Sequence, residues 1–159
     1  YALGIMNTVL GGGMSSRLYQ EIREDRGLAY STYSYQQGYS DAGYFGLYAG
    51  SSEENAPLVI QLMREQVDRM VSEGVSQAEF DLALGNITGG LALRYESTIA
   101  RMNRLLSAEI GTGEYLSVSE VMQRFQSVSL SQIQAVAGEV FARPSSLVAV
   151  GPKLTGLSL

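Results

Sequence analysis

Residues 10–49 read LGGGMSSRLYQEIREDRGLAYSTYSYQQGYSDAGYFGLYA, and this stretch decides the fold. Its glycine triplet ends a short apolar helix that we expect over residues 2–10. Ser15 or Ser16 then caps a second short helix, because a serine hydroxyl can accept a hydrogen bond from a free amide of the first turn. This second helix is expected to end near Gly27, where the composition of the chain changes.

Tyrosine, threonine and serine dominate residues 28–37, a composition that favours a β-strand. Residues 44–49 alternate apolar side chains with tyrosine and glycine, which is typical of a half-buried strand. Residues 40–43 lie between the two segments and are rich in turn formers. Together the three segments predict a β-hairpin.

The rest of the chain carries mostly helical signals. Pro57 lies in the first turn of an amphipathic helix. Three capping boxes, Ser followed three residues later by Glu or Gln, open further helices after Ser76, Ser117 and Ser129.

Two expectations concern where these later elements end. The helix after Ser76 is expected to run to about Ile110, with a kink near Gly89 and Gly90. Residues 146–150 predict a short buried strand at the end of the chain.

The order of elements predicts an α+β two-layer sandwich, in which helices pack on one face of a small antiparallel or mixed sheet. A sheet of three strands is thin for so many helices, so we expect a leading strand before Tyr1 in the natural protein. We expect a single domain over residues 1–152, cut from a longer polypeptide, and a tail over residues 153–159.

Composition excludes several classes of function. The 159 residues include no cysteine and no histidine, which excludes disulfides, histidine-based catalysis and the common zinc sites. The formal net charge is −5 and there is no basic run, so we expect no nucleic-acid partner. No apolar stretch approaches the ~18 residues of a membrane helix, so we expect no membrane partner. Without a signal sequence the expected compartment is the cytoplasm, with the mitochondrial matrix as the alternative.

Three features each have two interpretations. The Gly11–Gly13 loop precedes a helix as phosphate loops do, but it lacks the Gly-Lys-Ser/Thr ending, which favours a tight turn. The carboxylates of Glu21, Glu24 and Asp25 either form a solvated helix face or hold a metal ion, and their spacing matches no calcium loop. The ten tyrosines form either ordinary sheet surface or a surface that contacts peptides.

Arg23 and Tyr30 form the most informative pair. Arg23 lies at the end of the expected second helix, and Tyr30 lies at the start of the expected strand. Gly27 allows the chain to reverse between them, so the two side chains can converge. A guanidinium and a phenol both donate hydrogen bonds, and such a pair suits a peptide carbonyl or a developing oxyanion.

The segments Leu10-Gly-Gly-Gly-Met-Ser-Ser-Arg-Leu-Tyr19 and Ile22-Arg-Glu-Asp-Arg-Gly-Leu-Ala-Tyr-Ser31 resemble the C-terminal domain of pitrilysin-type zinc peptidases, which include the mitochondrial processing peptidase. The resemblance extends over nearly the whole chain. It implies a fold in which two similar α+β domains form one half of a clamshell, and two halves enclose a chamber. The implied partners are an N-terminal zinc-bearing domain of the same polypeptide, a second clamshell half in a homodimer, and peptide substrates.

The zinc motif of this family, H-x-x-E-H, lies in the N-terminal domain, and this chain contains no histidine. The resemblance therefore implies zinc in the intact enzyme, bound by another domain, and none bound by this chain. It also implies that Arg23 and Tyr30, which match an Arg and a Tyr seven residues apart in the family, hold the substrate backbone and assist the tetrahedral intermediate.

The function implied is that of the partner domain of a zinc-dependent endopeptidase. The alternative is a non-catalytic subunit of the same fold, such as a respiratory-complex core subunit or the inactive half of a paired peptidase.

Overall fold

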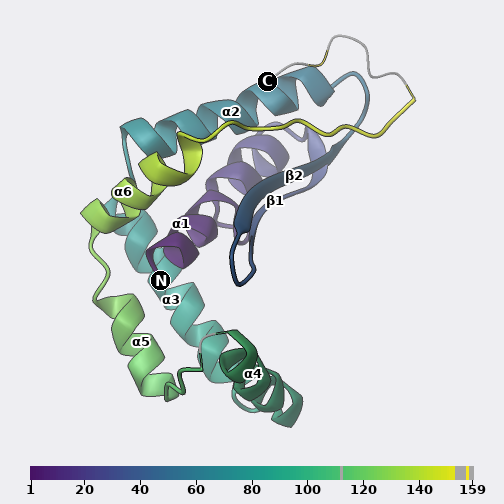
Figure 1. The fold of residues 1–159 in the computed structure, drawn as a ribbon. Helices are drawn as coiled ribbons and strands as arrows, with labels where there is room; N and C mark the ends of the chain where they lie inside the picture. The colour runs from purple at the N-terminus through teal and green to yellow at the C-terminus, as the bar shows by residue number, and fades with distance from the viewer. Residues whose placement is uncertain (112, 153–156, 158–159) are drawn as a thin grey trace.

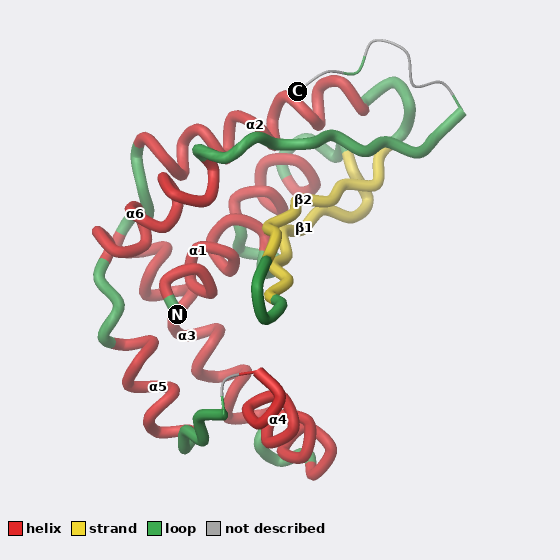
Figure 2. Tube along the Cα trace, viewed as in Figure 1, coloured by secondary structure: helices red, strands yellow, loops and turns green. Residues whose placement is uncertain are grey.

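The fold is seen in a computed structural model that describes residues 1–111, 113–152 and 157. The chain forms a group of helices and one β-hairpin that lies beside α1 (Figure 1, Figure 2). In chain order the elements are α1 (Ala2–Gly11), the π-helix η1 (Tyr19–Glu24), β1 (Ala29–Gly38), β2 (Gly43–Ser51), α2 (Ala56–Ser72), α3 (Gln77–Arg94), α4 (Thr98–Gly111), α5 (Val118–Gln126) and α6 (Leu130–Phe141).

The hairpin is antiparallel, and its two faces differ. Alternate residues of β1 point toward α1, where Thr32 and Ser34 are buried. Tyr33 and Tyr35 lie on the other face and are exposed. The predicted α+β class is therefore confirmed, with the helical layer against one face of the sheet.

The helix α1 forms the centre of the core. Ile5, Met6 and Leu10 are fully buried, together with Ile22 of η1 and Ile133 of α6. Ile5, Met6 and Leu10 recur at helical spacing and so lie on one face of α1. Because a ten-residue helix is too short to be stable alone in water, its burial in the core stabilises it.

Gly11 allows the end of α1 to approach β1 closely. A Cβ atom at this position would lie 2.2 Å from the backbone nitrogen of Ser34, so only glycine fits there. The hydroxyl of Ser34 donates a hydrogen bond to the side-chain oxygen of Asn7 at 2.8 Å. The first glycine of the triplet thus packs the helix against the strand.

The three capping boxes are confirmed. In each, the serine hydroxyl accepts a hydrogen bond from the backbone N–H three residues later, and the side chain at that position accepts from the serine N–H. Each box satisfies two amides that a helix N-terminus would otherwise leave free, so α3, α5 and α6 begin where the sequence predicts.

The prediction of one long helix from Ser76 to about Ile110 was wrong. The chain instead breaks between Arg94 and Thr98, and no break occurs at Gly89 and Gly90. The hydroxyl of Ser97 accepts a hydrogen bond from the backbone N–H of Ala100 at 3.3 Å and so starts a new helix. Arg104 donates to the hydroxyl of Tyr95 and to the carbonyl of Leu116, which holds the new helix at the break.

The prediction of a strand over residues 146–150 was also wrong. Residues 144–150 form no regular element, and Val148 and Val150 are 85% and 97% exposed. Among the described residues the sheet has two strands, and neither pairs with this segment. Apolar patterning alone does not create a strand, because the backbone groups also need a hydrogen-bonding neighbour. Figure 1 shows the segment running extended past α2 after α6 ends.

Two further points complete the fold. Six residues of the expected tail over 153–159, namely 153–156, 158 and 159, lie outside the described part of the chain. None of the helices in the described part is both long and apolar enough to cross a membrane.

Candidate functional site

The turn between η1 and β1 brings the two singled-out residues to one place. The N–H of Leu28 donates to the carbonyl of Ile22, and the N–H of Gly27 donates to the carbonyl of Arg23. The Gly27 bond, with Gly27 at φ +63°, is that of an αL C-cap, in which a left-handed glycine ends a helix. The Leu28 bond spans six residues and so closes a wider turn around it. The chain therefore reverses directly behind Arg23 and enters β1 within a few residues.

Arg23 lies on a widened helical turn. The N–H of Asp25 donates to the carbonyl of Gln20 at 2.9 Å, a bond between residues five apart, as in a π-helix. The helical stretch begins at Arg17, but among the described residues no N–H of its first turn donates to the hydroxyl of Ser15 or Ser16, so the predicted serine cap was wrong. The Ser16 hydroxyl instead donates to the carbonyl of Gly13 at 2.6 Å. Such π-turns are rare and occur often at functional sites.

Tyr30 lies on a β-bulge. Ala29 pairs with Ser51 and Ser31 pairs with Gly50, so Tyr30 is an extra residue without a partner in β2. In a regular strand Tyr30 would share the buried face of Thr32, because side chains alternate with period two. The bulge turns it outward, and its side chain is 84% exposed.

The π-turn and the bulge together place Arg23 beside Tyr30. The Cζ atom of Arg23 lies 5.2 Å from the centre of the Tyr30 ring, within the range of a cation–π contact. It also lies 4.9 Å from the centre of the Tyr19 ring. Each contact at such an exposed site contributes about 0.5–1 kcal/mol. The expected convergence of the pair is thus present in the structure.

Sequence reasoning missed Tyr19. Its spacing of four residues from Arg23 is the signal that could have found it, because residues four apart share a helix face. An aromatic residue in that position contacts a cation one turn later.

The charged groups next to Arg23 in the sequence include one ion pair. Arg26 pairs with Glu21 at 2.6 Å on the exposed surface, and such pairs contribute little. Within the described residues no three His, Cys, Asp or Glu side chains gather in a way that could hold a metal ion. Glu24 and Asp25 are exposed and Glu21 pairs with Arg26, an arrangement typical of a solvated helix face. The chain also has no His or Cys, so its residues do not fit a zinc ion.

A partly buried ion pair supports the segment that leads into η1. The Nε of Arg17 lies 2.6 Å from the carboxylate of Glu79, and its Nη2 donates to the carbonyl of Gly74 at 2.7 Å. Hydrogen bonding from Arg17 lowers the pKa of Glu79 from 4.5 to about 2. Glu79 is also the acceptor in the capping box of α3, so one carboxylate joins the two segments.

The glycine loop is a turn between helices. Its amide at Gly12 donates to the carbonyl of Thr8, and its carbonyl at Gly13 accepts from the N–H of Ser16. Because these amides already donate hydrogen bonds within the chain, the loop is better explained as a turn than as a phosphate-binding loop.

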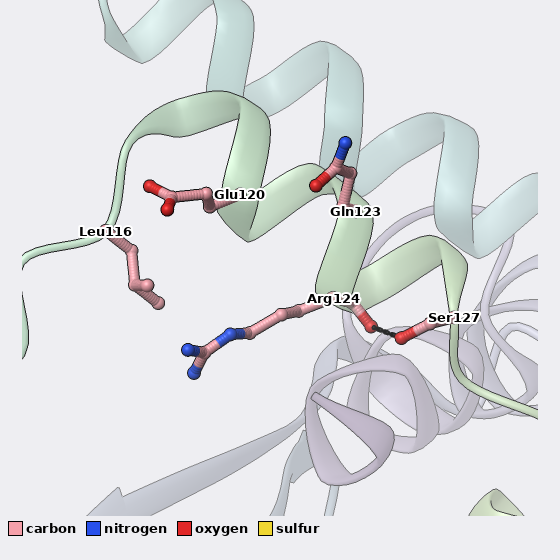
Figure 3. A pocket seen from close by; sticks show the side chains of 5 residues that line it. All are labelled: Leu116, Glu120, Gln123, Arg124 and Ser127. Carbon is pink, nitrogen blue, oxygen red and sulfur yellow. Dashed lines mark hydrogen bonds between the residues drawn. The ribbon is translucent and has the colours of Figure 1, made fainter.

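A depression on α5 is a weaker candidate (Figure 3). It has a volume of about 320 Å³ and is lined by Leu116, Glu120, Gln123, Arg124 and Ser127. Its cation, Arg124, pairs with Glu114, which lowers the pKa of that carboxyl group. It contains neither Arg23 nor Tyr30, and its Glu120 and Ser127 side chains already have hydrogen-bond partners within the chain.

The exposed tyrosines of the hairpin pack against one another. The rings of Tyr33 and Tyr48 stack with their centres 4.9 Å apart, and those of Tyr35 and Tyr44 meet edge to face at 5.9 Å. The Tyr35 ring covers Gly46, where an added Cβ would come within 2.5 Å of it. The exposed face of the hairpin is therefore covered by tyrosine rings that contact one another, starting a few residues after Tyr30.

Comparison with known proteins places this chain in a family. The model of the peptidase M16 inactive domain matches residues 1–87, more than half of the chain. An uncharacterized zinc protease of Streptomyces coelicolor is 43% identical over 152 residues, which cover 96% of this chain and 33% of that protein. One of Bacillus subtilis is 32% identical over the same share of this chain and 37% of its own length.

Solved structures agree. The peptidase M16 inactive domain from Pseudomonas fluorescens superposes with a TM-score of 0.76 and 26% identity, covering 87% of this chain and 33% of that one. A protease from Helicobacter pylori has a TM-score of 0.78 at 20% identity, covering 88% and 34%, which shows the fold alone. The chain spans about a third of the length of the curated relatives it matches. It belongs to the peptidase M16 inactive-domain family.

Proposed function

We propose that this chain is the partner domain of a zinc-dependent endopeptidase, and that Arg23 and Tyr30 contact the backbone of its peptide substrates. The single observation that carries this proposal is the Arg23–Tyr30 pair. Two local irregularities, the π-turn and the bulge, turn both side chains to one exposed place. Irregularities of this kind cost stability, and they occur preferentially where a side chain must be aimed.

The chemistry of the pair fits a peptide carbonyl. The hydroxyl of Tyr30 can donate one hydrogen bond, and the guanidinium of Arg23 can donate several. Both bonds strengthen when the carbonyl oxygen gains negative charge, because hydrogen bonds to ionised acceptors are stronger. Donors aimed at such an oxygen lower the barrier of acyl transfer.

Zinc belongs to another part of the proposed enzyme. The relatives named zinc proteases are about three times as long as this chain. The zinc would be held by an N-terminal domain of the same polypeptide, and a second clamshell half, in a homodimer, would close the chamber around the peptide. This chain contributes binding and orientation.

Tyr30→Phe in the intact polypeptide tests the proposal. The substitution removes the hydroxyl and keeps the ring that contacts Arg23. We expect kcat/KM for an unstructured model peptide to fall at least about tenfold, at the low end of the loss of one oxyanion donor.

Tyr115→Phe is the matched control, because Tyr115 is also exposed and lies between α4 and α5. We expect it to leave kcat/KM unchanged. A wild-type rate for Tyr30→Phe would make Tyr30 ordinary sheet surface. An intact polypeptide without zinc or cleavage would instead indicate the non-catalytic alternative.

A further inference from the structure

We propose that Tyr19 is a positioning residue, whose ring fixes the guanidinium of Arg23 and keeps its N–H groups free for the peptide. This inference rests on the proposed function and adds a third residue to that site. Tyr19 opens the π-helix η1, and Arg23 follows one widened turn later. The centre of the Tyr19 ring lies 4.9 Å from the Cζ of Arg23.

The guanidinium of Arg23 contacts two aromatic rings, whereas four other arginines contact carboxylates. Arg17, Arg26, Arg69 and Arg124 each pair with a glutamate within 4.0 Å. Arg23 precedes Glu24 and Asp25 in the sequence, yet in the described part of the chain it forms no such pair. A carboxylate would occupy the in-plane N–H groups of a guanidinium, whereas an aromatic ring contacts its face and leaves them available.

Of the two rings, Tyr19 supplies the fixed side. Tyr30 is 84% exposed, so its ring alone gives Arg23 little support. Tyr19 is half-buried and lies on the same short helix as Ile22, whose side chain is completely buried. Because the buried Ile22 anchors this short helix in the core, the Tyr19 ring has a fixed position, and the guanidinium of Arg23 packs against it.

The ring, and not the hydroxyl, is what this role requires, because the attraction comes from the π face. Tyr19→Leu keeps apolar volume but removes that face, whereas Tyr19→Phe keeps it. In the intact polypeptide, with an unstructured fluorogenic peptide as the probe, we expect Tyr19→Leu to lower kcat/KM about tenfold through misplacement of Arg23. We expect Tyr19→Phe to stay within about twofold of wild type.

A double substitution separates positioning from general damage. If Tyr19 acts through Arg23, Tyr19→Leu causes no further loss of kcat/KM once Arg23→Ala is present. Tyr95→Leu is the control away from the site, because the Tyr95 ring also contacts an arginine, with 5.2 Å between the Arg104 Cζ and the ring centre, and its hydroxyl accepts a further hydrogen bond from that arginine. We expect that variant to lose thermal stability and to keep its kcat/KM.

The outcomes are distinguishable. If Arg23→Ala itself leaves kcat/KM unchanged, the proposed function fails and this inference fails with it. If Arg23→Ala lowers kcat/KM and Tyr19→Leu does not, only the positioning role is overturned. Losses that add fully in the double variant, or a loss in Tyr19→Phe equal to that in Tyr19→Leu, also overturn it.

Discussion

Glu79→Gln removes the negative charge from the ion pair that joins the loop before η1 to the start of α3. The substitution leaves the capping box intact, because glutamine serves in the same position of the α6 box at Gln132. It therefore isolates the interaction with Arg17. That side chain is only 11% exposed, and its Nη1 is buried without a partner in the described chain.

The structure sets the size of the effect. A depression of the Glu79 pKa from 4.5 to about 2 corresponds to about 3 kcal/mol if converted in full. The Glu79 side chain is 31% exposed, and part of the pKa shift comes from hydrogen bonds with Ser76, so the share that belongs to Arg17 is smaller than this figure. The substitution also leaves the buried Arg17 guanidinium without its counter-charge, which increases the loss of stability. We expect a loss of about 2 kcal/mol in the free energy of unfolding at pH 7.

The sign of the pH dependence follows from the lowered pKa. The contribution of Glu79 is fully present above its ordinary pKa and is lost as the pH falls through the folded-state value. The difference between wild type and Glu79→Gln is therefore greatest at neutral pH and shrinks between about pH 4.5 and pH 2.

Urea denaturation of the 159-residue chain at several pH values measures this difference. Glu73→Gln is the control, because Glu73 pairs with Arg69 at 3.2 Å on a surface where both side chains are more than half exposed. We expect that control to lose less than about 0.5 kcal/mol. A Glu79→Gln effect no larger than the control, or one that does not change with pH, would refute the reasoning.

Two other predictions concern the turn and the metal. Gly27→Ala should lower the free energy of unfolding by about 1 kcal/mol, because Gly27 has φ +63° and open space around it, so only backbone strain is added. Gly13→Ala, also in open space but without a positive φ, should cost less in the same urea titration; equal losses would contradict the role of Gly27 as a left-handed C-cap. The 159-residue chain should bind no stoichiometric zinc in a metal analysis after dialysis, and tight one-to-one binding would overturn the assignment of zinc to another domain.

Local signals predicted much of the fold. The capping boxes at Ser76, Ser117 and Ser129 are complete within four residues, so the start of each helix could be read from the sequence. The hairpin also has its own turn and strand composition. Ser97 also caps its helix, α4, but Ala100 stands where a capping box has Glu or Gln, so the sequence carries only half of that signal.

Other errors concern contacts between distant segments. The pattern of residues 146–150 predicts a strand, but it does not supply a neighbouring strand. Tyr30 is exposed because of a register shift against Ser51 and Gly50, which no spacing within β1 encodes. The approach of Arg23 to Tyr30 was expected from Gly27, whereas the π-turn and the contact with Tyr19 needed the structure.

Photocrosslinking at position 30 tests the central claim most directly, because it detects contact with the peptide independently of turnover. Tyr30→benzoylphenylalanine would be introduced into the intact polypeptide. The protein would be treated with a chelator to prevent cleavage and then mixed with a labelled unstructured peptide. The same substitution at Tyr115 serves as the control. We predict a peptide adduct at position 30 that excess unlabelled peptide abolishes and that position 115 does not form. The absence of an adduct at position 30, or equal labelling at both positions, would contradict the claim.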